Sequence, residues 1–120
     1  VNETKKILDK NIELTATCVR IPVLISHAES INIEFKKPFT LEKISEALNL
    51  ADGCKVIDER KDGGYITPVE ATGKNETFIS RIRKDNSNEK AINLWCVSDN
   101  LLRGAALNAV EIAEAYIKNK

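Results

Sequence analysis

The sequence has no net charge, no long hydrophobic run and no glycine-rich phosphate loop. Its 18 basic and 18 acidic residues give a net charge of +0 and are interleaved along the chain. Because phosphate binding needs a positive surface, this balance argues against nucleic acid as the main partner. A membrane-spanning helix needs roughly 18 or more consecutive apolar residues, and no such run occurs. We therefore expect neither nucleic acid nor a membrane as partner.

Cysteine is also scarce. The three cysteines, Cys18, Cys54 and Cys96, are widely spaced and form no Cys-x-x-Cys pair, so the sequence predicts neither a metal site nor a disulfide framework. The first residues lack the apolar stretch of a signal peptide. We expect buried, reduced thiols in a cytoplasmic protein.

Methionine is absent altogether. Residues 3–8 resemble the end of a helix whose first turns are missing. With 120 residues, the chain has room for one domain of ordinary size. We therefore expect a fragment of a longer protein.

The residues that are present begin with a β-rich stretch. Residues 14–20 carry the β-branched residues Thr15, Thr17 and Val19, which predicts a strand that ends or bends at Pro22. Further on, Ile31, Ile33 and Phe35 alternate with polar residues. This period of two predicts a strand with one face that is exposed or covered by a partner.

Helix and strand signals follow one another in the middle of the chain. Thr40 is a good N-cap for a helix that ends at Asp52-Gly53. Residues 55–57 predict a short strand, and residues 58–74 predict a polar loop. Residues 77–84 and 91–97 predict a hairpin. In the first of these two strands, the two faces should carry Phe78, Ser80, Ile82 and Lys84 on one side and Ile79, Arg81 and Arg83 on the other.

The last element is a helix from about residue 101 to 117, with Ser98 or Asp99 as its cap. The order of elements indicates an α+β fold: a mixed, largely antiparallel sheet with helices on one face, plus the C-terminal helix. We expect residues 1–97 to form the main domain and residues 98–120 to form the terminal helix.

Two residues are candidates for chemistry. His27 is the only histidine; a lone histidine is often structural, but it can give or take a proton at neutral pH. Arg20 can clamp a carboxylate with two parallel hydrogen bonds, or it can pair with Glu13 or Glu29 at a sheet edge. A bend at Pro22 could bring Arg20 and His27 to one pocket.

Other residues keep two interpretations. Trp95 is more typical of a core or an interface than of a binding platform. Arg81 and Arg83 can face an acidic partner surface in a dimer, or only solvent.

Three separated motifs carry a family resemblance. The chain is similar to aspartate-semialdehyde dehydrogenases from Asn2 to Glu114, and the separation of seven residues between Arg20 and His27 matches their pattern. The matching stretches are residues 17–30 (TCVRIPVLISHAES), Gly73 with residues 79–85 (ISRIRKD), and residues 93–110 (NLWCVSDNLLRGAALNAV).

The resemblance implies a function for these residues. The family reduces L-aspartyl 4-phosphate to L-aspartate 4-semialdehyde with NADPH, in the biosynthesis of lysine, threonine and methionine. Arg20 would bind the substrate carboxylate, and His27 would serve as the catalytic general acid and base. Asn100 would lie near the nicotinamide end of NADP, or it is only a first-turn residue of the helix. The chain would be the substrate-binding and dimerisation domain, with its terminal helix packed on a missing nucleotide-binding domain.

The chain also departs from the family pattern. No cysteine lies in the Asn-Pro-x-Cys context of the family's nucleophile, and Glu111 stands where many relatives carry Gln. NADP would be bound mainly by the missing domain, so we expect this chain alone to be inactive. The alternative is a non-catalytic dimerisation module. In both cases we expect a homodimer.

Overall fold

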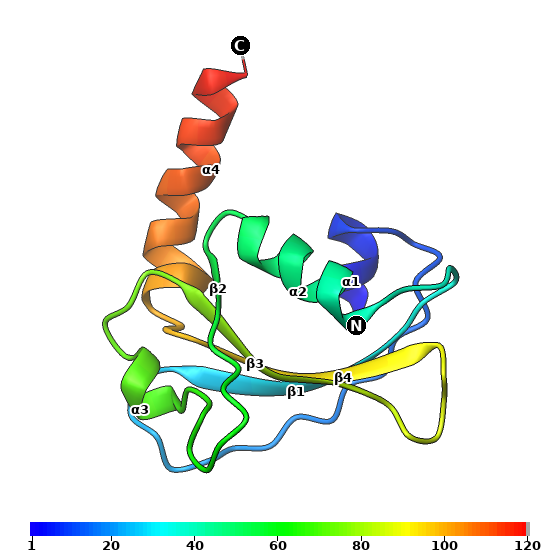
Figure 1. Cartoon of the computed structure of the whole chain (residues 1–120). Helices are drawn as coiled ribbons and strands as arrows, with labels where there is room; N and C mark the ends of the chain where they lie inside the picture. Colours follow the sequence, from blue (N-terminus) through cyan, green and yellow to red (C-terminus); the bar gives the residue numbers. More distant parts are fainter. Residues whose placement is uncertain (120) are drawn as a thin grey trace.

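The computed structural model describes residues 1–119 and shows one four-stranded sheet with helices around it (Figure 1). Strands β1 and β3 both pair with β4 in antiparallel fashion, and β2 pairs with β3 in parallel. The strand order is β1-β4-β3-β2, which confirms the predicted α+β class with a mixed, largely antiparallel sheet. The elements are α1 (Asn2–Ile7), β1 (His27–Glu34), α2 (Leu41–Leu50), β2 (Cys54–Val56), α3 (Pro68–Ala71), β3 (Thr77–Lys84), β4 (Ala91–Ser98), η1 (Leu102–Ala106) and α4 (Leu107–Lys118).

Helix α2 covers one face of the sheet. It begins as predicted, because the Thr40 hydroxyl accepts a hydrogen bond from the Lys43 backbone N–H at 3.3 Å. The predicted alternation in β1 is also confirmed, since Ile31 and Ile33 pack into this layer. The layer contains the buried residues Ile79, Ile82, Ile92 and Leu94, and part-buried residues that include Leu41, Ile44 and Leu48 of α2.

A smaller cluster lies on the opposite face. Ala71, Phe78 and Val97 are buried there, and Ala28 and Trp95 pack against them. Ala71 belongs to α3, within a stretch that we expected to be only loop. The helix forms because Thr67 and Glu70 make a capping box and Pro68 occupies the first turn, where its missing N–H costs nothing.

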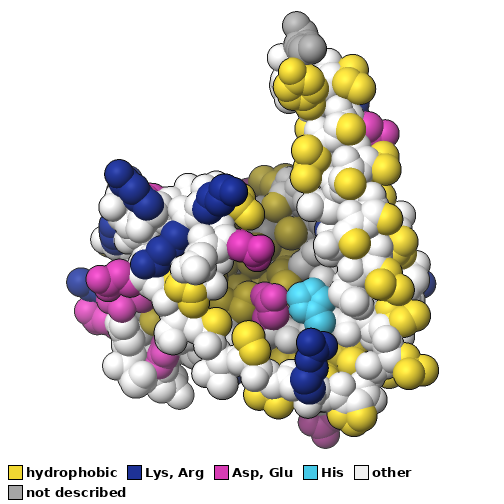
Figure 2. All heavy atoms as spheres, turned by 180° about the vertical axis from the view of Figure 1, so that it is seen from behind, with side chains coloured by type: hydrophobic (Ala, Val, Ile, Leu, Met, Phe, Trp, Pro, Cys, Tyr) yellow, Lys and Arg dark blue, Asp and Glu magenta, His cyan; other side chains and the backbone are white. Residues whose placement is uncertain are grey.

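The C-terminal helix projects away from the sheet (Figure 1). It starts with a π-helical turn, η1, and continues as α4. Hydrophobic side chains lie along the projecting part (Figure 2), and Val110, Ile112 and Ile117 are all more than half exposed. Within residues 1–119, no helix combines the length and the apolar character needed to cross a bilayer.

A β-bulge interrupts β3. Ser80 pairs with Trp95 and Arg83 pairs with Asn93, so β3 contains one more residue than β4 over this interval. Arg81 takes a positive φ of 57°, which a non-glycine residue adopts only when its surroundings hold it there. The prediction that Phe78, Ser80 and Ile82 share one face is therefore wrong beyond Ser80: Phe78 joins the α3 side and Ile82 joins the α2 side.

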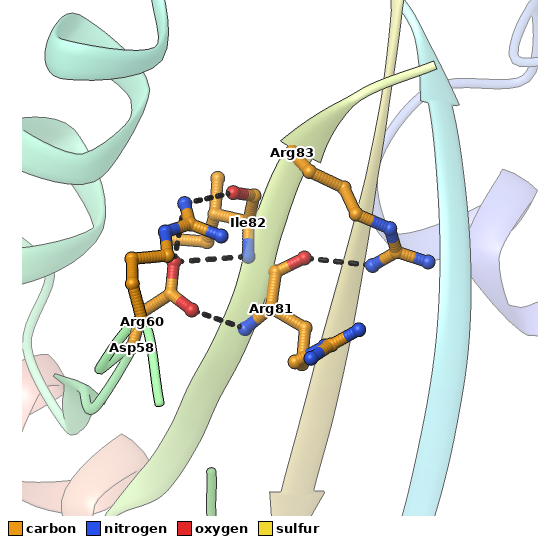
Figure 3. A network of polar contacts seen from close by, with 5 residues as sticks. All are labelled: Asp58, Arg60, Arg81, Ile82 and Arg83. Carbon is orange, nitrogen blue, oxygen red and sulfur yellow. Dashed lines mark hydrogen bonds and ion pairs between the residues drawn. The ribbon is translucent and has the colours of Figure 1, made fainter. Parts of the chain in front are cut away.

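Side chains from the loop after β2 hold the bulge in place (Figure 3). The Asp58 carboxylate accepts hydrogen bonds from the backbone N–H groups of Arg81 at 2.8 Å and Ile82 at 3.1 Å. Arg60 donates to the Ile82 carbonyl at 2.7 Å and pairs with Asp58 at 3.1 Å. Arg83 donates to the Arg81 carbonyl at 2.8 Å. The backbone groups that the bulge takes out of the ladder thus find side-chain partners.

The segment that precedes β1 is irregular. The strand predicted at residues 14–20 is wrong, since the structure shows no strand between α1 and His27. Residues 9–22 are all exposed. The chain leaves α1 on the α2 side of the sheet and then crosses to the opposite side before it reaches β1 (Figure 1). Thr and Val favour extended backbone, but a strand also needs a neighbour with which to exchange hydrogen bonds, and within residues 1–119 this segment pairs with none.

Candidate active site

An open cavity of about 410 Å³ lies between this irregular segment and the sheet. Its lining includes Arg20 and other residues between Thr17 and Leu24, together with Ser26, His27, Trp95 and Asn100. The three residues predicted to form the site, Arg20, His27 and Asn100, therefore come together although they are up to 80 positions apart (100 − 20).

His27 is fixed by its place at the start of β1. It stands opposite Ser98 in the pairing with β4, and its Nε2 lies 3.3 Å from the Ser98 hydroxyl. Its Nδ1 lies 3.7 Å from a carboxylate oxygen of Glu29. The ring is about half exposed, and Figure 2 shows the histidine at the surface near the foot of the terminal helix. An imidazole that has a hydrogen-bond partner at Nε2, a carboxylate near Nδ1 and an exposed ring suits proton transfer to a ligand.

Arg20 comes from the irregular segment. It is exposed, and it makes no hydrogen bond or ion pair with any other residue that the structure describes. The alternative pairing with Glu13 or Glu29 is absent from residues 1–119, where a Glu29 carboxylate oxygen lies 3.7 Å from His27 Nδ1 instead. Arg20 lines the cavity, and its guanidinium group can offer two parallel N–H groups to an anion.

Asn100 is the second residue after β4. Its side-chain oxygen accepts a hydrogen bond from the Ser26 backbone N–H at 2.7 Å. Ser26 is buried and has a positive φ of 76°, and its hydroxyl lies 3.1 Å from that of Thr72. Asn100 is therefore tied to the residue immediately before His27, which a first-turn position in a helix alone does not explain.

Asp99 holds the same region from the side of the terminal helix. Its carboxylate accepts hydrogen bonds from the Gly73 N–H at 2.8 Å and from the N–H groups of Leu101 and Leu102 at 2.8 and 3.1 Å. These hydrogen bonds hold the pKa of Asp99 below its usual value, and the bond from the Gly73 N–H has the largest effect on this pKa. Sequence reasoning named Asp99 only as a possible cap. It missed Ser26 and Thr72, for which the sequence offers no signal.

The remaining site-related residues have structural partners. Trp95 belongs to the α3-side cluster, and its Nε1–H donates to the Ile66 carbonyl at 2.9 Å, so it forms part of the core as well as the cavity wall. Burial, followed by the nearby Glu29 and Cys54, raises the pKa of Cys96 to about 11. Cys96 is then protonated at neutral pH and is a poor nucleophile.

All three cysteines are free thiols. The expectation that they are buried is wrong for Cys18, which is exposed because the irregular segment has no strand partner, and Cys54 and Cys96 are only partly buried. Cys18 is absent from the cavity lining.

A family model described as "Semialdehyde dehydrogenase, dimerisation domain" matches residues 1–103. The chain belongs to this family. As a semialdehyde dehydrogenase dimerisation domain, it is 47% identical over 118 residues to an aspartate-semialdehyde dehydrogenase of Prochlorococcus marinus, covering 98% of this chain and 34% of that protein. The corresponding enzyme of Campylobacter jejuni is 47% identical over 120 residues, covering 100% of this chain and 35% of that protein.

Solved structures show the same fold for the dimerisation domain. A crystal structure of aspartate semialdehyde dehydrogenase II complexed with ASA from Vibrio cholerae aligns with a TM-score of 0.88 and 39% identity, over 97% of this chain and 34% of that one. Aspartate semialdehyde dehydrogenase from Francisella tularensis aligns with a TM-score of 0.77 and 30% identity, over 91% of this chain and 33% of that one. The chain spans about a third of the length of the curated relatives that it matches.

Proposed function

We propose that this chain is the substrate-binding and dimerisation part of an NADPH-dependent aspartate-semialdehyde dehydrogenase. The complete enzyme would reduce L-aspartyl 4-phosphate to L-aspartate 4-semialdehyde and release phosphate, in the cytoplasmic biosynthesis of lysine, threonine and methionine. The observation that carries the proposal is the meeting of Arg20, His27 and Asn100 around one cavity. The names of the matched relatives support it.

Arg20 would bind the substrate. The α-carboxylate of an aspartyl compound is planar, and a guanidinium group matches it with two parallel hydrogen bonds. Because Arg20 has no ion-pair partner within residues 1–119, it need not break a protein contact to bind this anion. Its role is to orient the acyl phosphate so that the carbonyl carbon faces the reacting groups.

His27 would move the protons. A thiol supplied elsewhere in the complete enzyme loses its proton to His27 and attacks the acyl carbon, which expels phosphate and leaves a thioester. When bound, NADPH would supply the hydride that reduces this thioester. His27 then gives its proton to the new oxyanion of the hemithioacetal. It takes the proton back when the C–S bond breaks and the aldehyde leaves.

This chain fits only one end of the cofactor. Asn100 offers an amide at the cavity, but the sequence has no glycine-rich turn whose backbone N–H groups could cradle the cofactor phosphates. The nucleotide part would therefore be held by another domain of the complete polypeptide. We propose that residues 98–120 pack on that domain, which would cover exposed apolar residues such as Ile112 and Ile117, and that residues 1–97 mediate a homodimer.

The test is an assay of the complete polypeptide that carries this sequence. It should reduce L-aspartyl 4-phosphate with NADPH and release phosphate, while the 120-residue chain alone shows no turnover. Light scattering run in parallel should report a dimer. A complete polypeptide that dimerises but neither binds NADPH nor turns over substrate would favour the non-catalytic dimerisation module instead.

A further inference from the structure

We propose that Thr72, which ends the single-turn helix α3, is a positioning residue for His27. Its hydroxyl accepts a hydrogen bond from the Ser26 hydroxyl and so holds Ser26, the residue directly before His27, in a conformation that serine does not favour. The imidazole would then be in place for proton transfer before substrate binds. This inference rests on the proposed function, in which His27 is the general acid and base.

The conformation of Ser26 needs support from its surroundings. Its φ of 76° lies in the left-handed region, which a residue with a Cβ adopts only when other contacts hold it there. Ser26 is buried, so its polar groups need partners within the protein. Its N–H donates to the Asn100 side-chain oxygen at 2.7 Å, and its hydroxyl lies 3.1 Å from the Thr72 hydroxyl. Both contacts oppose a relaxation of the backbone before His27.

The direction of the contact between the two hydroxyls follows from a second bond at Thr72. The Thr72 hydroxyl also lies 3.0 Å from the Pro68 carbonyl, which can only accept a hydrogen bond. A hydroxyl has a single hydrogen, so Thr72 donates it to Pro68 and offers a lone pair to Ser26. Ser26 is therefore the donor to Thr72. The hydrogen bonds thus run from Ser26 through Thr72 to the backbone of α3.

The residues on both sides of Thr72 are fixed. Ala71 is buried in the cluster on the α3 side of the sheet. On the other side, the Gly73 N–H donates to the Asp99 carboxylate at 2.8 Å. The Thr72 hydroxyl is therefore held in place by the core and by the start of the terminal helix, and it can act as a fixed acceptor for Ser26.

His27 lies where the support of the ladder begins. It is the first residue of β1, and its partner in the ladder is Ser98 of β4. The direction of the peptide before His27 therefore depends on Ser26. If Ser26 relaxed, the first pair of the ladder would loosen, and the ring would leave its place 3.3 Å from the Ser98 hydroxyl. Proton transfer needs an imidazole within hydrogen-bond reach of the reacting atom, so such a shift would lower kcat.

The experiment compares Thr72→Val with Thr72→Ser in the complete polypeptide. Valine has the branched shape of threonine but no hydroxyl, whereas serine keeps the hydroxyl and loses only a methyl group. We expect the kcat of Thr72→Val to fall by about fivefold, the effect of one lost hydrogen bond, and the KM for L-aspartyl 4-phosphate to stay within about twofold. Thr72→Ser should keep kcat within about twofold of the unmodified enzyme. A raised KM with an unchanged kcat would show that Thr72 does not position His27.

Thr40→Val is the matched control for a general loss of stability. The Thr40 hydroxyl also makes one hydrogen bond, with the Lys43 N–H, but it caps α2 and is absent from the cavity lining. Thr40→Val should lower the midpoint of urea unfolding and leave kcat unchanged. An equal fall of kcat in Thr40→Val and Thr72→Val would assign the effect of Thr72 to stability alone.

A second pair of substitutions tests the backbone of Ser26. Alanine keeps the Cβ and loses the hydroxyl, whereas glycine loses both and adopts a φ of 76° without strain. We therefore expect the kcat of Ser26→Gly to exceed that of Ser26→Ala by about threefold or more. An equal or lower kcat for glycine would show that the hydroxyl contact does not serve to hold this φ.

A double substitution tests whether Thr72 acts through His27. Thr72→Val should lower kcat by less than about twofold in the His27→Asn enzyme, because a general base that is absent cannot be displaced. A fivefold fall in both backgrounds would show that Thr72 acts on another group and would overturn this inference alone. A His27→Asn enzyme as active as the unmodified one would instead overturn the proposed function of His27, and its positioning by Thr72 with it.

Discussion

The paired strands and the irregular segment before β1 build the same cavity in different ways. Ile92 and Val97 of β4 are 0% and 1% exposed, whereas Val19 and Leu24 of the segment are 76% and 103% exposed. His27 is the first residue of β1 and pairs with Ser98 of β4, and Asn100 follows two residues later and binds the Ser26 N–H. Arg20 belongs to the irregular segment. In the proposed function, proton transfer falls to the paired strands, the stiff wall of the cavity, and recognition of the substrate carboxylate falls to the irregular segment, its loose wall.

The largest expected effect tests the stiff wall. In the complete polypeptide, His27→Asn should lower kcat by about 10²–10⁴-fold, because asparagine cannot take the proton of the attacking thiol. NADPH binding, measured by fluorescence, should stay unchanged. A kcat close to that of the unmodified enzyme would show that His27 does not transfer protons in the reaction, and the proposed difference in role between the two walls would then be wrong.

A matched pair of substitutions compares the stability of the two regions directly. Ile92→Ala removes a fully buried side chain and should lower the free energy of unfolding by about 2–5 kcal/mol. Ile21→Ala, at a residue that is 52% exposed, should change it by less than about 0.5 kcal/mol. Urea unfolding of both variants measures the difference. Equal losses would mean that the segment packs as firmly as the sheet.

Arg20→Lys tests the loose wall. Lysine keeps the charge but loses the planar fork of N–H groups. The fall in kcat/KM should therefore correspond to a loss of roughly 1–3 kcal/mol of transition-state stabilisation. Most of the change should appear in the KM for L-aspartyl 4-phosphate, with kcat nearly unaffected. If kcat falls instead, Arg20 is held as rigidly as His27 and takes part in the transition state.

The smallest effect concerns the hairpin between β3 and β4. Hydrogen bonds from the Ser87 side chain, then from its backbone N–H and from Asn32, lower the pKa of Asp85 to about 2. The folded protein therefore favours the ionised carboxylate. Its contribution to stability is complete above about pH 4 and is lost as the pH falls toward 2. The stability difference between the unmodified chain and Asp85→Asn should shrink over this range in acid urea titrations, and a constant difference would contradict it.

The local patterns were sufficient for much of the fold. Alternation at Ile31 and Ile33 located β1, and the Thr40 cap located α2, because each depends on neighbours in sequence. Helix α3 was missed although its Thr67-Pro68 start and Glu70 give a recognisable capping box. The segment at residues 14–20 failed for another reason: strand formation depends on a partner, which the sequence of the segment itself does not specify.

The candidate site was likewise predictable only in part. Arg20 and His27 were candidates from their chemistry and then from the family resemblance, Asn100 was identified from the resemblance alone, and the structure brings all three to one cavity. Their supports were not predictable, because the Ser26–Asn100 and Asp99–Gly73 contacts join residues that are 74 and 26 positions apart. Nothing near Ser26 in the sequence signals its positive φ, since glycine is the usual residue for that conformation.

The bulge at Arg81 constrains the number of residues in β3. One extra residue lets a single strand send Phe78 into the layer beneath α3 and Ile82 into the layer beneath α2. Deleting that residue would make the ladder regular, but every later side chain of the strand would change sides. A substitution at this point is therefore easier to accommodate than an insertion or a deletion, because the number of residues in β3 determines on which face of the sheet each later side chain packs.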